Sequence, residues 1–241
     1  MHAIGQNESL RRYTAMRTTF GRLRLNYLAR LHQWLWRCHS ASQALAKRSF
    51  DVTASGVFLI VLSPLYLLIA LLIRLEDGGP AVFTQTRVGR FGREFTMYKF
   101  RSMCANAEAR LQEVLSRNHH KEGVTFKIKD DPRLTRVGKW LRKYSLDELP
   151  QVWNVFKGDM SLVGPRPPIP REVAHYSLAD RRRLAVKPGI TCLWQIGGRS
   201  EIDFSGQVKL DVEYIESAGF TTDIKILFKT VPAVVAAKGA C

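Results

Sequence analysis

The 241-residue sequence is poor in cysteine and lacks the patterns that would make its cysteines metal ligands. The 4 cysteines form no CxxC pair, and no histidine stands at metal-ligand spacing from them. We therefore expect free thiols in a reducing compartment and no zinc finger.

Internal repeats, low-complexity tracts and a recognisable signal peptide are also lacking. Because 46% of the residues are hydrophobic, the chain can bury a core and is not a disordered basic tail. RNP, helix-turn-helix and zinc signatures of nucleic-acid binding are absent too. The sequence is instead rich in positive charge, +16 formally, which favours an anionic partner: nucleic acid, a membrane surface or a phosphorylated small molecule.

The longest uncharged run extends from Val52 to Ile73. At about 1.5 Å per residue it is long enough to cross a bilayer core of about 30 Å. Pro64 stands in the middle of the run, directly after Ser63. Since proline lacks the N–H that would bond to residue 60, the helix must kink or break there, and each half could enter about half of the bilayer.

The charges around this run favour a re-entrant helix-break-helix with both ends on one side of the membrane. Residues 1–51 and the chain after Arg74 are both basic, and a span would place one of them outside, against the tendency of Lys and Arg to stay cytoplasmic. The Ser63 hydroxyl is placed to bond a carbonyl freed by the break. A kinked span and a buried core helix of a soluble protein are the alternatives.

Residues 1–46 are predicted to form a basic N-terminal segment with an amphipathic helix at the headgroup level of anionic lipid, anchored by Trp34 and Trp36. An ordinary helix covering a soluble core is the alternative. The apolar residues that recur at helical spacing are Leu23, Tyr27, Leu28, Leu31, Trp34 and Leu35. We expect the re-entrant membrane segment at residues 47–76 and a compact cytoplasmic domain at residues 77–241.

The compact domain has short segments separated by strong turn signals, which indicates a mainly helical α+β fold with a small β-hairpin or sheet. Ala81 to Thr86 and Glu94 to Phe100 are predicted to be the strands of the hairpin. Helices are predicted from Ala105 to Asn118 and from Val137 to Tyr144.

Asp147 and Glu148 form a pair of adjacent carboxylates in a basic and apolar neighbourhood. Ser145 and Glu148 have the spacing of a capping box at a helix start, although Pro150 weakens that reading. If the preceding helix continued instead, Glu148 would fall on its apolar stripe, where a carboxylate is partly desolvated and a candidate site residue.

Several cations lie near this pair in sequence: Lys99, Arg101, Arg142 and Arg166. Each alone is an ordinary surface charge, but together they would suit a diphosphate, with arginine forks on its oxygens and a lysine as a point charge. Two carboxylates beside phosphate-binding cations indicate a divalent metal or an acyl-phosphate nucleophile.

The order of the motifs resembles the bacterial sugar transferase family, the monotopic polyprenyl-phosphate phosphoglycosyl transferases. The resemblance covers about residues 47–230. The motifs that carry it are Ser63-Pro64, Phe83-Thr84-Gln85-Thr86-Arg87-Val88-Gly89, Tyr98-Lys99-Phe100-Arg101-Ser102-Met103, Asp131-Pro132-Arg133, Ser145 to Gln151, Lys157-Gly158-Asp159-Met160-Ser161, Gly164-Pro165-Arg166-Pro167 and Lys187-Pro188-Gly189-Ile190-Thr191.

The resemblance implies transfer of a sugar 1-phosphate from a UDP-sugar to undecaprenyl phosphate at the cytoplasmic face of the bacterial inner membrane, with release of UMP. It implies that Asp147 is the nucleophile and that Asp147 and Glu148 bind Mg²⁺. It also implies that Lys99, Arg142 and Arg166 contact phosphate, and it matches Asp223 to a further acidic position. The segment before Asp223 departs from the usual family pattern, which makes that match less secure.

Two other classes of function compete with this hypothesis. A membrane-bound scaffold or regulator would keep the fold without catalysis, and nucleic-acid binding is indicated only by charge. The expected partners are the UDP-sugar, undecaprenyl phosphate and anionic lipid, without nucleic acid; a homo-oligomer is left open.

Overall fold

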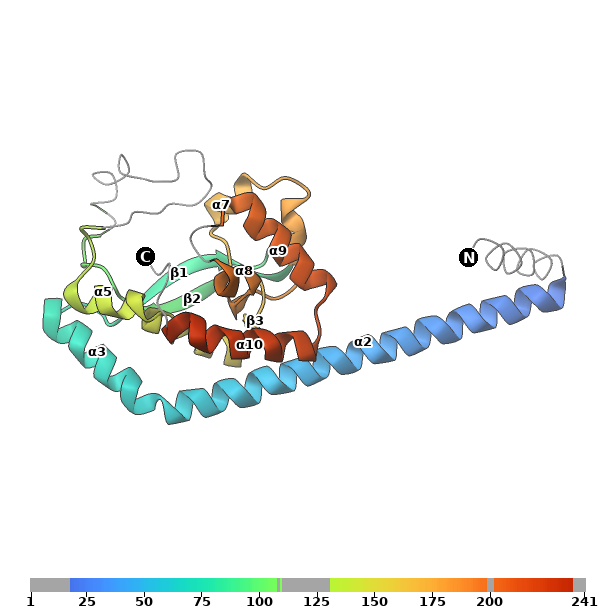
Figure 1. The fold of residues 1–241 in the computed structure, drawn as a ribbon, viewed down its shortest axis with the longest axis horizontal. Coiled ribbons are helices and arrows are strands. Elements are labelled where there is room, and N and C mark those ends of the chain that lie inside the picture. Colours follow the sequence, from blue (N-terminus) through green and yellow to red (C-terminus); the bar gives the residue numbers. More distant parts are fainter. Residues whose placement is uncertain (1–17, 108, 110–130, 199–201, 236–241) are drawn as a thin grey trace. The chain divides into compact units, whose positions relative to one another are not determined.

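The computed structural model describes residues 18–107, 109, 131–198 and 202–235, and it divides the chain into two compact units, Met1–Lys47 and Arg48–Cys241 (Figure 1). The described elements are α2 (Thr19–Val61), α3 (Ser63–Asp77), β1 (Val82–Val88), η1 (Arg90–Gly92), β2 (Glu94–Phe100), α5 (Arg136–Lys143), η2 (Leu146–Glu148), α6 (Gln151–Lys157), β3 (Ser161–Val163), α7 (Pro170–Ala174), η3 (Asp180–Ala185), β4 (Gly189–Thr191), α8 (Leu193–Gly197), α9 (Phe204–Glu216) and α10 (Phe220–Val235).

In the first unit, the described residues from Thr19 onward are helical. The apolar side chains that recur along this part of α2 are exposed, among them Leu23, Tyr27 and Trp34. The predicted helix is confirmed. Its position at a membrane surface stays a prediction.

The predicted break in the apolar run is confirmed. α2 ends at Val61, α3 begins at Ser63, and the two helices are bent by 60° at the break. The Ser63 hydroxyl donates to the carbonyl of Ile60 at 2.8 Å, so it satisfies the acceptor that Pro64 leaves without an N–H partner. No single helix in the described part of the chain is long and apolar enough to cross a membrane, although this bent pair together has the required length and composition.

Within the second unit, which begins at Arg48, both sides of the bend are hydrogen-bonded to other elements of that unit. Near the start of that unit, Arg48 donates to the carbonyl of Val155 at the end of α6 at 2.7 Å, and Asp51 accepts from the N–H of Leu162 in β3 at 3.1 Å. At the end of α3, Glu76 accepts from the first two backbone N–H groups of α5, at 2.7 and 3.2 Å. The two arms of the bend therefore begin and end on the same body.

The antiparallel hairpin β1–β2 separates two hydrophobic clusters. Its register pairs Val82 with Phe100 and Val88 with Glu94. Phe100 packs against Ile69 and Ile73 of α3 and against Leu141 of α5. Because side chains alternate across a strand, the opposite face of β2 is free to build the second cluster.

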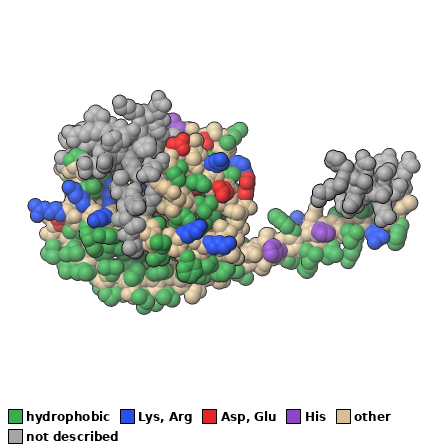
Figure 2. All heavy atoms as spheres, viewed as in Figure 1, with side chains coloured by type: hydrophobic (Ala, Val, Ile, Leu, Met, Phe, Trp, Pro, Cys, Tyr) green, Lys and Arg blue, Asp and Glu red, His purple; other side chains and the backbone are tan. Residues whose placement is uncertain are grey.

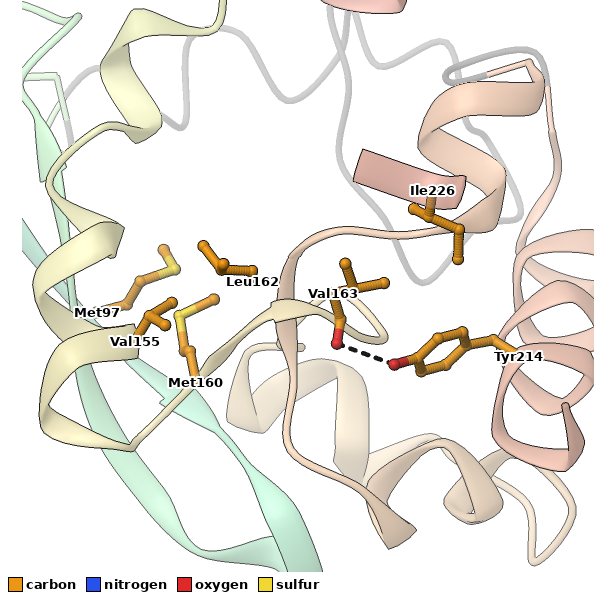
Figure 3. Packing of buried hydrophobic residues seen from close by; sticks show 7 residues of the cluster. All are labelled: Met97, Val155, Met160, Leu162, Val163, Tyr214 and Ile226. Atoms are coloured by element: carbon orange, nitrogen blue, oxygen red, sulfur yellow. Dashed lines mark hydrogen bonds between the residues drawn. The ribbon is translucent and has the colours of Figure 1, made fainter. Parts of the chain in front are cut away.

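The second cluster joins β2 and α6 to the short parallel pair β3–β4 and to the C-terminal helices α9 and α10 (Figure 3). Tyr214 of α9 reaches into it, and its hydroxyl lies 3.0 Å from the carbonyl oxygen of Val163. The cluster consists of Met97, Val155, Met160, Leu162, Val163, Tyr214 and Ile226.

Exposed hydrophobic side chains gather along one edge of the second unit, where α3, α10 and the last turns of α2 run, and most Lys, Arg, Asp and Glu side chains in this view lie away from that edge (Figure 2). From Val57 to the end of α3, the exposed large hydrophobic residues are Val57, Phe58, Ile60, Val61, Leu67, Leu68, Leu71, Leu72 and Leu75. An apolar surface this continuous is typical of a region that contacts a membrane or another protein.

The mainly helical α+β fold and the predicted hairpin are confirmed. The predicted helix from Val137 to Tyr144 corresponds to α5, which lies one residue earlier at both ends. The predicted helix from Ala105 to Asn118 falls mostly outside the described residues, and its first three residues form a turn.

Candidate active site

The carboxylate pair lies on a sharp turn between α5 and α6. α5 ends at Lys143, and Ser145 has a left-handed backbone conformation with φ of 55°, which a residue with a side chain rarely adopts. The chain then enters the short helix η2. Leu146 of this helix and the following Leu149 pack against the first hydrophobic cluster, which contains Ile69 and Ile73 of α3 and is called the α3 cluster below. Asp147 and Glu148 are thereby held beside Lys99 of β2.

Both sequence-based interpretations of this segment are wrong. Ser145 precedes η2, but its side chain makes no cap hydrogen bond, so there is no capping box. The preceding helix does not continue to Glu148 either, because Ser145 in the left-handed region ends it.

Lys99 joins the two carboxylates. Its Nζ donates to Glu148 Oε1 at 2.7 Å and lies 3.9 Å from Asp147 Oδ2. The Asp147 side chain is only 11% exposed, compared with 26% for Glu148. The Asp147 side chain is therefore the less exposed of the two, and Glu148 forms the closer contact with the cation.

The pKa values of the two carboxyl groups are shifted in opposite directions. Burial raises the pKa of Asp147 above its usual value; the charge of Lys99 opposes this effect, and the charge of Glu148 reinforces it. Burial acts on Glu148 in the same direction, but the charge and hydrogen bond of Lys99 outweigh it and lower the pKa of Glu148. A pair with separated pKa values is a common property of functional sites.

A polar pocket opens beside Glu148. It is lined by side chains from β1, β2, α6, α8 and the loop after β3, including Arg87, Lys99, Glu148, Gln151, Arg166 and Gln195. The positive charge of Arg166 helps to lower the pKa of Glu148. Three cations and one carboxylate around one pocket favour an anionic ligand.

The structure brings Arg142 near the pair and gives Arg101 a different partner. Arg142 donates through Nε to the hydroxyl of Ser102 at 3.0 Å, and its charge lowers the pKa of Asp147 against the effect of burial. Arg101 is buried and forms an ion pair with Asp77 at the end of α3. A phosphate-binding role for Arg101 stays a prediction.

Asp223 lies in α10 and does not line this pocket. It is 3% exposed, and its Oδ1 lies 2.8 Å from the hydroxyl of Tyr214. The same Tyr214 hydroxyl donates to the backbone carbonyl of Val163 in β3. The geometry gives Asp223 a structural contact, and its assignment as a site residue stays a prediction.

Arg87, Gln151 and Gln195 are pocket residues that were not among the sequence-based candidates. Gln151 is buried and hydrogen-bonds to Glu148, which lowers the pKa of that carboxyl. Arg87 and Gln151 do belong to recognised motifs, but a motif does not show which of its side chains line a pocket.

The match to a known family agrees with this arrangement. Residues 42–237 match the family described as Bacterial sugar transferase. The chain is a member of the bacterial sugar transferase family.

Several named bacterial sugar transferases are similar to the chain. Galactosyl transferase CpsE of Streptococcus agalactiae is 49% identical over 83% of the chain, and undecaprenyl-phosphate galactose phosphotransferase of Salmonella typhimurium is 44% identical over 83% of it. The chain spans only 44% and 42% of the length of these two proteins. Exopolysaccharide production protein ExoY of Sinorhizobium fredii is 42% identical over 81% of the chain and 88% of its own length.

Proposed function

We propose that this bacterial sugar transferase moves a sugar 1-phosphate from a UDP-sugar to undecaprenyl phosphate, as an early membrane step in exopolysaccharide or capsule synthesis. The observation that carries the proposal is the desolvated Asp147 beside Glu148 and Lys99, next to a pocket that contains Arg166. Family membership and the names of the relatives support the same reaction.

The reaction has two displacements at one phosphorus atom. In the first, an oxygen of Asp147 attacks the phosphorus that bears the sugar; the bond to the UMP phosphate breaks, and its electron pair leaves with UMP. In the second, an oxygen of the lipid phosphate attacks the same phosphorus, and the bond to Asp147 breaks to restore the carboxylate. A covalent intermediate lets a water-soluble and a lipid substrate use one carboxylate in turn.

The cations supply the electrostatic part of catalysis. Phosphoryl transfer depends mainly on in-line placement and on neutralising the charge of the phosphate oxygens. Lys99 and Arg142 are the cations whose charges act on Asp147, so they would contact the phosphoryl group that it receives. Arg166 lines the adjoining pocket and would contact the second phosphate of the nucleotide.

We include Mg²⁺ as the cofactor in this proposal. Within the described residues no group of three or more His, Cys, Asp or Glu side chains could enclose a metal ion. Mg²⁺ does not need such a cage, since it is commonly held by one or two carboxylates together with substrate phosphates, so Asp147 and Glu148 fit it. When bound, it would neutralise charge on the phosphate oxygens.

The site would operate at the cytoplasmic face of the membrane, with the bent pair α2–α3 inserted as a re-entrant hairpin. The hydrogen bonds of Arg48 and Asp51 before the bend, and of Glu76 after it, hold both sides of the bend to one body and support this topology over a span. The exposed apolar side chains of the pair would face lipid. Asp147 follows Leu146, which packs on α3, so the reacting carboxylate would stay close to the lipid phosphate.

The experiment that tests the reaction compares the wild-type chain with Asp147→Asn. With membranes, radiolabelled UDP-sugar and undecaprenyl phosphate, we expect the wild-type chain to label the lipid and the variant to lose the activity by at least about a thousandfold, since the amide is not a nucleophile. Lipid labelling by Asp147→Asn at the wild-type rate, with equal protein in the membrane, would refute the proposed role of Asp147.

A further inference from the structure

Arg87 and Lys99 lie on one face of the hairpin. Arg87 is paired with Phe95 in the β1–β2 register, and directly paired residues share a face. Side chains at every second position share a face as well, so Arg87, Met97 and Lys99 all point to the same side, and all three line the pocket beside Glu148. Phe95 and Lys99 are about 13 Å apart along the strand, so the two cations approach the pocket from separate ends.

Arg87 is an unusual residue to bury. It is 7% exposed and forms no salt bridge among the described residues. Its Nη1 donates to the carbonyl of Pro167 at 2.8 Å, and its Nη2 donates to Gln85 Oε1 at 2.7 Å. Within the described part of the chain, its Nε is buried and has no hydrogen-bond partner. A buried guanidinium whose hydrogen-bond partners are all neutral, and whose Nε–H has none, is costly unless a ligand completes it.

The charges around the carboxylates divide into two groups. Lys99 and Arg142 act on Asp147. Burial, followed by the like charge of Arg166, lowers the pKa of Arg87 to about 10, and the charges of Glu172 and Glu148 oppose this effect. Arg87 and Arg166 line the pocket together with Glu148, whereas Asp147 is not among its lining residues, so the pocket is a second place where an anion lowers the electrostatic free energy.

We propose that Arg87 and Arg166 form one anion subsite that serves both half-reactions: it binds the phosphate of UMP as it leaves and the lipid phosphate as it attacks. This inference rests on the proposed function and adds a shared position for the two substrates' phosphates. Attacking and leaving oxygens lie in line at the phosphorus. Both phosphates therefore lie opposite the same Asp147 oxygen, at different times.

The bonds made and broken require this sharing. When the Asp147 oxygen attacks, the bond that breaks is to the UMP phosphate, whose oxygen takes the electron pair. When the intermediate is discharged, a lipid phosphate oxygen forms the new bond from that same side, and Asp147 takes the electron pair. Arg87 would offer Nε–H to both anions while Nη1 holds the Pro167 segment, which carries Arg166, in place.

The test measures the two discharges of the isolated covalent intermediate, one by UMP and one by undecaprenyl phosphate. The full-length chain is used in lipid nanodiscs. We expect Arg87→Lys to slow both discharges by a similar factor, about tenfold or more, because lysine keeps a charge but cannot provide the guanidinium geometry. Partial recovery of both rates in Arg87→Ala on addition of methylguanidinium would support direct contact with the phosphates.

Arg133→Lys is the matched control, because Arg133 is equally buried but is bonded to Asp131 and does not line the pocket. We expect Arg133→Lys to lower the melting temperature but to leave both discharge rates, each expressed per folded enzyme, unchanged. Slowing of only one discharge by Arg87→Lys would overturn the shared subsite, as would unchanged rates for both.

A binding measurement separates this inference from the proposed reaction. Calorimetric titration of the full chain with UMP is expected to show binding that weakens about tenfold or more in Arg87→Lys but not in Arg133→Lys. If the wild-type chain binds UMP through Arg87 but forms no intermediate, the proposed reaction fails and the phosphate-binding role stands. If UMP binding does not depend on Arg87, the subsite is wrong whatever the activity.

Discussion

At the residue scale, two neighbouring carboxylates have different properties because their surroundings differ. Asp147 is the more buried, and Glu148 has the closer contact with Lys99. At neutral pH, Glu148 therefore remains an ionised partner of Lys99. Burial makes the negative charge of the Asp147 carboxylate costly in the free protein. A bond from its oxygen to phosphorus removes that charge and is therefore favoured.

The raised pKa of Asp147 predicts the pH dependence of the first half-reaction. Since the nucleophile must be deprotonated, UMP release in a single turnover should fall as the pH drops through that pKa, which lies above the ordinary value of about 3.9. Lys99→Met removes the main charge that opposes the effect of burial. In this variant we expect a lower maximal rate and an acid limb displaced upward by about one pH unit or more.

Lys139→Met is the control for this measurement, because Lys139 is an exposed lysine on α5 outside the pocket. Its acid limb should coincide with that of the wild type. An acid limb at the same pH in Lys99→Met and wild type would contradict the electrostatic coupling of Lys99 to Asp147.

The sequence was sufficient to select Asp147, Glu148 and Lys99 as neighbours, because the two motifs that contain them, Tyr98–Met103 and Ser145–Gln151, belong to one ordered set that resembles a single family. It could not show how the pair is presented. Ser145 has the residue type of an N-cap, yet its left-handed backbone depends on Leu146 and Leu149 reaching the α3 cluster, which is a tertiary effect. Arg87 also escaped selection, since its burial depends on the loop that contains Pro167.

At the element scale, α5 positions Arg142 through a close helix contact. Gly138 permits this contact, because a Cβ built on it would lie 1.9 Å from the backbone oxygen of Ser102. The same Ser102 accepts a hydrogen bond from Arg142 through its hydroxyl. The approach of α5 and the direction of Arg142 are thus coupled.

Gly138→Ala should therefore move α5 and reduce both stability and activity. We expect a loss of about 1–3 kcal/mol in the free energy of unfolding, measured by denaturation, because the added methyl group meets backbone that has to shift. The rate of UMP release per folded enzyme should fall as Arg142 moves.

Gly197→Ala is the matched control, since a Cβ at this helical glycine meets no atom of the described residues within 4 Å. Its stability should equal or slightly exceed that of the wild type. Wild-type stability and activity in Gly138→Ala would show that α5 does not depend on the contact with Ser102.

Elements with a strong local pattern were predictable, and those built by distant contacts were not. The hairpin has alternation and a turn of consecutive left-handed residues, Phe91 and Gly92, between its strands. The parallel strands β3 and β4 have only three residues each and exist through pairing across 25 or more positions, so no local periodicity marks them.

At the scale of the whole molecule, the account depends on the membrane segment returning to the side from which it entered. α3 contains 15 residues, and at about 1.5 Å per residue it is shorter than a bilayer core of about 30 Å. The hydrogen bonds of Arg48 before the bend and of Glu76 after it hold both sides of the bend to the same body.

This topology predicts the accessibility of two single cysteines, Ser49→Cys and Pro80→Cys, placed at exposed positions outside the bend. The native cysteines are replaced by alanine. A membrane-impermeant maleimide should label neither position in intact cells or spheroplasts and should label both after lysis. Labelling of one position from outside would establish a span and contradict the re-entrant hairpin.

The central claim is that Asp147 carries the phosphosugar between the two substrates. The most direct measurement is the intact mass of the purified chain after incubation with UDP-sugar alone, followed by peptide mapping. The account predicts a mass increase of one sugar phosphate, located on Asp147, with an equal amount of UMP released, and loss of the added mass when undecaprenyl phosphate is supplied. An unmodified chain under conditions in which lipid product still forms would contradict the account, because it would require direct transfer without a covalent intermediate.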